Sequence, residues 1–496
     1  MDGGTLAADV SRRRVLAITL MPIVVVLTTP SMIISYGADG DVYRNIAAAE
    51  RLAASGHYDP VRLPGSPMFD YLLAALSPWG GHYATNGAVL LFYLVGVVLF
   101  HHLARDRPAR LLLTALFAFT PVLLKNAVTT MDYIPGLTLL LASYAALMKD
   151  RLFAASLLLG LAAGMRVTNL AFVLPAAILI RLRNRPLSDL AIYSSLASIL
   201  ALGFHWRFAS ALATGTFALT PKPFLRWVHI AGHSALQLWG PVAFVTLLAV
   251  VALHTKRLQK LFSREEPVAD TAAIHLELST IVFFGLLFLL LPDEPEYLLP
   301  VVPFTYLLLA RFVPQPYIRL LTAMILLGGI VSLDMKGGES GRRTVQFTPA
   351  PGIVLKDYQQ RREWELLRNG IPKIPALGMA VVLVGTDYPL FYRNPHIDYV
   401  DLNDYPMLRE AFLYRENDAS VHRVGARIFK LKNRDIFFVT SLPRHICEDL
   451  QRRGIKLFIF SLMAPSYAIH LHGYDPDDLG IERLEVLCKS AFYRTK

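Results

Sequence analysis

Long apolar runs, each close to the length of a membrane-crossing helix, occupy the first two thirds of the chain. From Val15 to Ile34 twenty residues pass without a charge, and as a helix this stretch would be about 30 Å long, enough to cross a hydrocarbon core. Three arginines at 12–14 precede it, and it contains Pro22 and Pro30. A cleaved signal peptide would have a shorter apolar core, so the pattern favours an uncleaved signal anchor.

Basic or Pro/Gly-rich breaks divide the apolar sequence into further helices. The runs 152–163 and 167–181 are too short for two full spans and together too long for one, so we predict two half-length helices that meet near Gly164 and Arg166. With this pair counted as two, eleven transmembrane helices are predicted: 15–36, 84–104, 109–124, 131–148, 152–163, 167–181, 190–212, 234–253, 273–291, 296–312 and 316–333.

The distribution of Lys and Arg predicts the orientation of these helices. With a cytoplasmic N-terminus, the inner loops hold 17 Lys/Arg in 56 residues and the outer loops 8 in 98. The longest outer loop is the first, residues 35–83. We therefore predict a multi-pass protein of the cell (inner or plasma) membrane with its N-terminus in the cytoplasm and its C-terminus outside.

Composition agrees with a membrane protein, because 54% of the residues are hydrophobic and only 18% are charged. The net charge of +11 follows largely from the basic inner loops, and the membrane part shows no basic face with aromatic platforms, so no nucleic-acid partner is predicted. Cys447 and Cys488 are the two cysteines; they exclude a disulfide-built scaffold, and either a pair or two free thiols fits.

The composition changes near residue 334, after which the chain carries 24 of its 49 Lys/Arg among acids and short apolar runs. We predict a transmembrane domain over 1–335 and a soluble, extracytoplasmic α/β domain over 336–496. In the second domain, strands are expected at 380–384, 436–440 and 456–460, and an amphipathic helix at 444–453.

Two carboxylates, Asp39 and Asp41, follow directly after the first predicted span. Apolar residues at helical spacing over 42–53 predict a short helix along the membrane interface after them. One interpretation is that either aspartate is only the N-cap of that helix. The alternative is a functional site, because the same topology puts further acids on the outer side: Asp132, Asp293, Glu294 and Glu296.

The order of short motifs resembles the GT-C superfamily of membrane glycosyltransferases, specifically the branch of the lipid A aminoarabinose transferases and protein O-mannosyltransferases. An acid after the first span with a tyrosine four residues on is matched by Asp39 and Tyr43. The other matching segments, which together with these cover roughly residues 10–335, are Gly56-His57-Tyr58, the Pro64–Pro67 step, the glycine-rich 160–169 and Glu296-Tyr297-Leu298-Leu299-Pro300. Two departures are Gly40, where many relatives have a second acid, and Glu296, where an arginine often precedes the tyrosine.

The resemblance implies an inverting enzyme that takes a sugar from a polyprenyl-phosphate donor at the outer face of the membrane. Asp39 is then the expected base, with Asp41 as the alternative. Arg62 and Arg166 are candidate cations for the lipid phosphate, although Arg62 at a headgroup or Arg166 on helix carbonyls would serve structure alone. The remaining candidate substrate-binding residues are Tyr43, His57, Tyr58, Asp132, Glu296 and Tyr297; for Asp132 a helix cap is an equal alternative, and for His57 and Tyr58 interfacial anchoring.

A divalent cation at Asp39 and Asp41, helped by phosphate oxygens, is one possibility, but a metal-free site is favoured because the resembled branch generally works without one. The expected partners are membrane lipids, the polyprenyl-phosphate sugar donor and an acceptor that the sequence does not identify. Two other functions remain open. A transporter or flippase would place ionisable residues near the bilayer midplane and often show inverted repeats, and a non-catalytic scaffold would present its outer domain to a partner.

Overall fold

The computed structural model describes most of the helical part of the chain and, in the C-terminal part, the strands of its sheet and hairpin. The described residues are 19–58, 64–107, 109–206, 224–261, 268–290, 294–337, 345–370, 380–384, 398–401, 426–431, 434–439, 456–463, 466–471 and 484–485. By internal contacts the chain forms two units. The first comprises Met1–Ala38 and Asn45–Gln360, and the second comprises Asp39–Arg44 and Arg361–Lys496.

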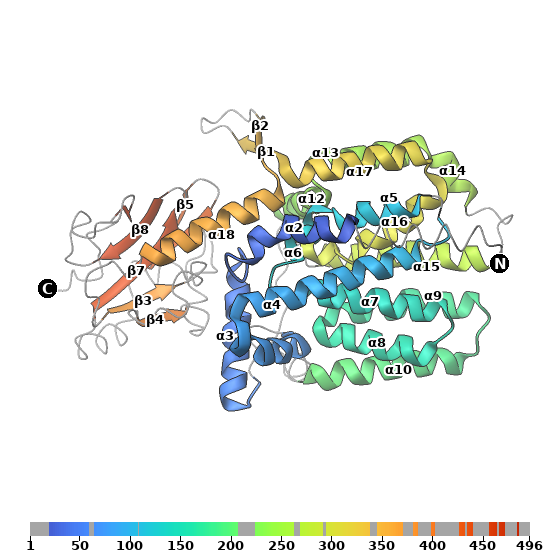
Figure 1. Ribbon diagram of the computed structural model, residues 1–496, viewed down its shortest axis with the longest axis horizontal. Helices are drawn as coiled ribbons and strands as arrows, with labels where there is room; N and C mark the ends of the chain where they lie inside the picture. Colours follow the sequence, from blue (N-terminus) through green and yellow to red (C-terminus); the bar gives the residue numbers. More distant parts are fainter. Residues whose placement is uncertain are drawn as a thin grey trace. The chain divides into compact units, whose positions relative to one another are not determined.

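The first unit is built from α-helices, several of which lie side by side, such as α7, α8 and α10 (Figure 1). Its core consists of aliphatic and aromatic side chains from nearly every helix. The elements are α2 (Met21–Met32), α3 (Gly40–Ser55, whose first turn belongs to the second unit), α4 (Pro67–Leu103), α5 (Arg110–Ala118), α6 (Pro121–Asn126), α7 (Tyr133–Met148), α8 (Leu152–Met165), η2 (Val167–Phe172), α9 (Val173–Leu182), α10 (Leu187–Phe204), α12 (Phe224–Trp239), α13 (Pro241–Leu253), α14 (Thr255–Lys260), α15 (Val268–Leu290), η3 (Pro295–Leu298), α16 (Val301–Phe312) and α17 (Gln315–Ile330).

The described helices have the composition of a multi-pass membrane protein. Three of them are both long and apolar enough to cross a membrane, within Pro67–Leu103, Leu187–Phe204 and Thr271–Leu290, and the bent pair Ile230–Trp239 and Pro241–Leu253 passes the same test together. Six other apolar helices of the described part are shorter than 18 residues. The predicted total of eleven spans therefore stays a prediction.

Several predicted helices differ from the observed ones. The one predicted at 316–333 ends at Ile330, and strand β1 follows from Val331. The helix predicted at 84–104 corresponds to the second part of α4; a further helical part, which begins at Pro67, precedes it across a break at Gly81, where φ is 52° and ψ is −132°. The helix predicted at 109–124 is interrupted between α5 and α6, where Pro121 begins the second piece. A proline lacks the N–H that would continue the preceding helix, and it is well suited to a first helical turn.

The helix predicted at 234–253 is two helices, α12 and α13, which meet at an angle of 89°. Gly240 lies between them with φ of 82°, a conformation that favours glycine, and Pro241 begins α13. The bend also requires a small residue for packing. A Cβ on Gly240 would lie 3.2 Å from the Cα of Gly328 in α17, so the two backbones touch there.

The break predicted near Gly164 and Arg166 is present, since α8 ends at Met165, Arg166 is extended and η2 begins at Val167. Two glycines of α8 bring it close to α10. A Cβ on Gly160 would lie 2.7 Å from Leu200, and one on Gly164 would lie 2.6 Å from Phe204. The glycine-rich step thus permits the close approach of helices that is common in membrane proteins.

A β-hairpin and α18 follow the helices. Strand β1 (Val331–Gly337) pairs antiparallel with β2 (Val345–Pro351), and α18 (Ile353–Gly370) comes next. The predicted domain boundary at 335 falls inside this hairpin, whereas the division by contacts falls after Gln360.

The second unit contains a five-stranded sheet of order β4-β3-β7-β8-β9 and a separate hairpin. Its strands are β3 (Ala380–Val384), β4 (Asp398–Asp401), β5 (Ala426–Leu431), β6 (Arg434–Val439), β7 (Lys456–Met463), β8 (Ser466–Leu471) and β9 (Leu484–Glu485). Strand β3 is parallel to β4 and β7, whereas β8 is antiparallel to β7. β3, β6 and β7 lie at the three expected strand positions. The expected helix at 444–453 lies outside the described residues, as do Cys447 and Cys488.

Candidate functional site

Arg166 occupies the break between α8 and η2, and hydrogen bonds make this break possible. Its own N–H donates to the carbonyl of Ala162 at 2.9 Å, and the Asn169 side chain donates to the same carbonyl at 3.1 Å. His205 contacts the carbonyl of Ala163 through Nε2 at 2.8 Å. Two carbonyls in the last turn of α8, those of Ala162 and Ala163, therefore have partners, as buried irregular backbone requires.

The guanidinium of Arg166 binds the carboxylate of Asp132. Nη1 of Arg166 lies 3.1 Å from Oδ1 and 3.3 Å from Oδ2, and Ser66 donates to Oδ2 at 2.7 Å. Asp132 precedes α7, but its side chain makes no capping hydrogen bond, so the cap interpretation does not hold for this residue. Arg166 likewise pairs with an acid rather than with helix carbonyls.

Two tyrosine rings enclose the same guanidinium. Its central carbon lies 4.3 Å from the ring centre of Tyr133 and 4.6 Å from that of Tyr297, within the range of cation–π attraction. The Arg166 side chain is 14% exposed. Both of its hydrogen bonds come from Nη1, so among the residues that the structure describes, Nε and Nη2 have no hydrogen-bond partner. A fixed cation with donors to spare can bind an anion.

Arg166 lines a small pocket that is partly open to solvent. Gly136 of α7 makes room for the segment around Arg166, since a Cβ there would lie 2.7 Å from the side-chain nitrogen of Asn169. The lining residues are Tyr133, Leu137, Arg166, Thr168, Asn169, Glu296, Tyr297, Leu299 and Pro300. Four elements, α7, η2, η3 and the break at Arg166, therefore build one concave site.

Glu296 of η3 is neutralised by a residue that the sequence motifs do not contain. Lys125 of α6 donates to Oε1 of Glu296 at 2.8 Å, and Asn126 donates to the same oxygen at 3.2 Å. Burial alone would raise the pKa of Glu296, but the Lys125 ammonium and the Asn126 amide bring that pKa below its usual value. A lone lysine in the otherwise apolar run 121–125 was the available signal for this pair.

Glu294 joins the same site through Tyr133, whose hydroxyl donates to a carboxylate oxygen of Glu294. Three of the acids predicted to lie on the outer side therefore surround Arg166 and its two tyrosines: Asp132, Glu294 and Glu296. Asp293 lies outside the described residues.

Asp39 and Asp41 belong to the second unit by contacts, and there Asp39 acts as a helix cap. Oδ1 of Asp39 accepts a hydrogen bond from the backbone N–H of Asp41 at 2.9 Å, which satisfies one free donor at the start of α3. Asp41 binds Arg44 one turn later, with 3.1 Å between Oδ1 and Nη1. The ring of Tyr43 contacts the edge of Trp364 in α18. A capping role and a catalytic role are compatible, because accepting a backbone N–H leaves the side chain a carboxylate.

His57 and Tyr58 follow α3 in the first outer loop. His57 is exposed, and its backbone N–H donates to the Ser55 hydroxyl at 3.1 Å. Tyr58 donates to Oδ2 of Asp70 at 2.9 Å and stacks on Tyr71. Burial and the Asp70 carboxylate raise the pKa of Tyr58 well above its usual value, so this phenol stays protonated. Arg62 lies outside the described residues.

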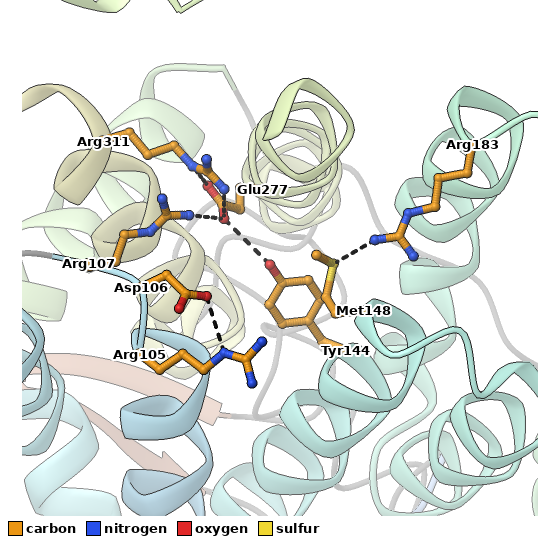
Figure 2. Close-up of polar contacts among 8 residues, drawn as sticks. All are labelled: Arg105, Asp106, Arg107, Tyr144, Met148, Arg183, Glu277 and Arg311. Carbon is orange, nitrogen blue, oxygen red and sulfur yellow. Dashed lines mark hydrogen bonds and ion pairs between the residues drawn. The ribbon is translucent and has the colours of Figure 1, made fainter. Parts of the chain in front are cut away.

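A second buried charge cluster is centred on Glu277 of α15 (Figure 2). Arg311, in the last turn of α16, binds both carboxylate oxygens of Glu277 at 2.8 Å. Arg107 lies 3.6 Å from Oε1, and the Tyr144 hydroxyl lies 3.5 Å from the same oxygen. The carboxylate is 1% exposed, so the arginines supply the charge that permits its burial.

No group of three or more His, Cys, Asp or Glu side chains among the described residues is arranged to hold a metal ion. Asp39 and Asp41 together supply two carboxylates. Asp39 accepts a hydrogen bond from a backbone N–H, and Asp41 accepts one from Arg44.

Comparisons with known proteins find similarity in structure rather than in sequence. No family model matches the chain, and no curated protein matches it. Its fold is similar to that of ArnT. The crystal structure of ArnT from Cupriavidus metallidurans in the apo state matches with a TM-score of 0.49 and 12% identity, over 77% of this chain and 85% of that one. The structure of the same protein bound to undecaprenyl phosphate matches with a TM-score of 0.44 and 13% identity, over 73% of this chain and 70% of that one.

Proposed function

We propose that the chain is an inverting membrane glycosyltransferase that moves a sugar from a polyprenyl-phosphate donor to a lipid, glycan or protein acceptor at the outer membrane face. The observation that carries the proposal is the state of Arg166. Asp132 and two tyrosine rings orient its guanidinium, and the residue lines a pocket. Among the described residues, Nε and Nη2 have no hydrogen-bond partner, so both can donate to a ligand.

Arg166 would bind the donor phosphate. When the bond between the anomeric carbon and the phosphate oxygen breaks, negative charge grows on the leaving phosphate, and a positioned cation stabilises that charge. Arginine suits this task because its planar fork of donors matches phosphate oxygens. Glu296 stands where the resembled family often has an arginine, but Lys125 pairs with it. Among the described residues Arg166, whose Nε and Nη2 are not engaged, is the candidate cation for the phosphate.

Asp39 would accept the proton of the acceptor hydroxyl, with Asp41 as the alternative base. The acceptor oxygen then forms a bond to the anomeric carbon as the polyprenyl phosphate leaves from the opposite face, which inverts the configuration. The proton goes to the aspartate and the electron pair of the broken bond to the phosphate. The order of motifs from Asp39 to Tyr297 supports this assignment.

The charge cluster at Glu277 bears on the alternative of a transporter. An ionisable residue in a membrane helix is a candidate for an ion or substrate pathway. Glu277, however, is neutralised by two arginines, one of them in the loop before α5 and the other in the last turn of α16. The cluster therefore fits a structural ion pair that joins α15 to the last turn of α16 and to the loop before α5, and this favours the enzyme over the transporter.

The proposal is tested with purified protein in lipid nanodiscs, a polyprenyl-phosphate sugar and membranes as the source of acceptor. We expect sugar-dependent release of polyprenyl phosphate, reduced at least 10²-fold in Arg166→Gln and only partly restored in Arg166→Lys. Arg185→Gln is the matched control, because Arg185 is 39% exposed and pairs with Asp150 outside the pocket. Equal release by wild type, Arg166→Gln and an empty nanodisc would overturn the proposal.

A further inference from the structure

A buried, uncharged network of side chains joins the exit of α2 to the segment that leads into Asp132. Its three central residues, Thr85, Asn86 and Thr130, have no exposed surface. Thr130 donates from its hydroxyl to Oδ1 of Asn86 at 2.7 Å, and the hydroxyl of Thr85 lies 2.8 Å from that of Thr130. Because the one hydroxyl proton of Thr130 goes to Asn86, its oxygen is left to accept from Thr85.

The amide of Asn86 holds the end of α2. Its nitrogen donates to the carbonyl of Ser35 at 2.8 Å and to that of Met32 at 3.3 Å. A backbone bond crosses at the same place, since the N–H of Thr130 donates to the carbonyl of Tyr36 at 2.9 Å. Residues 32–36 and 129–131 are thereby joined by one direct backbone hydrogen bond and, through the Asn86 side chain, by three more.

The two segments that the network joins each end at an acid of the proposed mechanism. Tyr36 is three residues before Asp39, and Thr130 is two residues before Asp132. Neither segment is a regular helix at this point, so the intrahelical ladder does not fix it. Asn45 of α3 adds a contact to the Sδ of Met131 at 3.5 Å.

We propose that Asn86, with Thr85 and Thr130, positions two segments of the transferase relative to α4. These are residues 32–36, which lead to Asp39, and residues 129–131, which lead to Asp132. These are positioning residues, because none of them belongs to the pocket. The inference rests on the proposed function for its effect on catalysis, whereas the tether itself can be measured without any activity. Misplacement of a reacting group by about 1 Å costs roughly 100-fold in rate, so a loss of the tether should reduce kcat.

Thr130→Val tests the proposal, because valine has nearly the same shape but cannot bond to Asn86 or Thr85. Hydrogen exchange of peptides covering 31–38 and 127–133 is measured by mass spectrometry in nanodiscs. We expect exchange there to become roughly 5- to 150-fold faster, the range that follows from an unsatisfied buried acceptor. For transfer, we expect kcat to fall about 10- to 100-fold with KM changed less than about threefold, and Thr130→Ser to restore both properties.

Thr280→Val is the matched control, since Thr280 is also fully buried but, among the described residues, hydrogen-bonds only within its own helix, to Leu276 at 2.7 Å. Unchanged exchange in Thr130→Val would overturn the tether. Faster exchange with unchanged kcat, or an equal fall in kcat in Thr280→Val, would overturn the positioning role. If the wild-type protein shows no transfer at all, the proposed function fails instead, and the exchange comparison still decides whether the network joins the two segments.

Discussion

Asp132 holds Arg166 through a single guanidinium nitrogen, Nη1, at 3.1 Å, with both side chains largely buried. The pair orients the cation without using all of its donors. We predict that Asp132→Asn and Arg166→Gln are coupled, with an interaction energy of about 0.5–3 kcal/mol in the free energy of unfolding. Denaturant unfolding of the two single variants and the double variant in detergent measures it. Strictly additive effects would mean that the pair does not form.

The pair of Lys125 and Glu296 predicts a pH dependence of stability. In the wild type the pKa of Glu296 is lowered, so its pairing stabilises the fold above the unfolded pKa and is lost as the pH falls through the folded one. In Lys125→Met only burial, Asn126 and a backbone hydrogen bond remain, and burial, the largest of these effects, should raise the pKa of Glu296 above its unfolded value. That variant then loses stability as the pH rises.

The expected difference in melting temperature between wild type and Lys125→Met is therefore small near pH 4 and large near pH 7. Thermal melts over this range provide the measurement, and Lys125→Met combined with Glu296→Gln is the control that should remove most of the difference at pH 7. A difference independent of pH would show that Lys125 acts through packing rather than through the charge of Glu296.

The Glu277 cluster predicts a stability effect without an effect on chemistry (Figure 2). Glu277→Gln removes the buried carboxylate that Arg107 and Arg311 contact, which should cost about 3–5 kcal/mol of stability. Asp150→Asn is the comparison, because that acid is 51% exposed and its removal should change stability by less than about 1 kcal/mol. A Glu277→Gln protein of normal stability that no longer transfers sugar, or that changes ion flux, would favour the transporter.

The positions of most helices could be predicted from apolar runs, because the length of a membrane-crossing helix leaves a clear pattern. The bend at Gly240 could not, since it depends on the approach of Gly328 from a helix far along the chain. In the candidate site, Arg166 could be predicted from the glycine-rich motif and Asp132 from the acids on the outer side, but their contact and the choice between cap and ion pair needed the structure. Lys125 was missed because its partner, Glu296, is 171 positions away.

The orientation in the membrane is a prediction of the charge asymmetry and of an odd number of spans. A reporter fused after Lys496 should behave as extracytoplasmic, whereas a reporter fused before Arg12 should behave as cytoplasmic. The measurement is reporter activity in intact cells at equal expression. A cytoplasmic signal from the C-terminal fusion would contradict both the count of eleven helices and the outer placement of residues 336–496.

The substitution Asp39→Asn separates the capping role of Asp39 from its proposed role as the base. The structure uses Asp39 as the N-cap of α3, and asparagine caps helices about as well as aspartate. Asp39→Asn should therefore fold normally but lack the basic carboxylate. Asp41→Asn is the matched control, because Asp41 binds Arg44 and is the alternative base. Loss of transfer only in the Asp41 variant would keep the mechanism and move the base to Asp41.

The most direct measurement is the rate of sugar transfer by Asp39→Asn relative to wild type, at equal amounts of folded protein in the same membranes. The account predicts a reduction of roughly 10²- to 10⁴-fold, the usual contribution of a general base, with an unchanged melting temperature. Activity within twofold of wild type in both Asp39→Asn and Asp41→Asn would contradict it, because the chain would then transfer sugar without the proposed base.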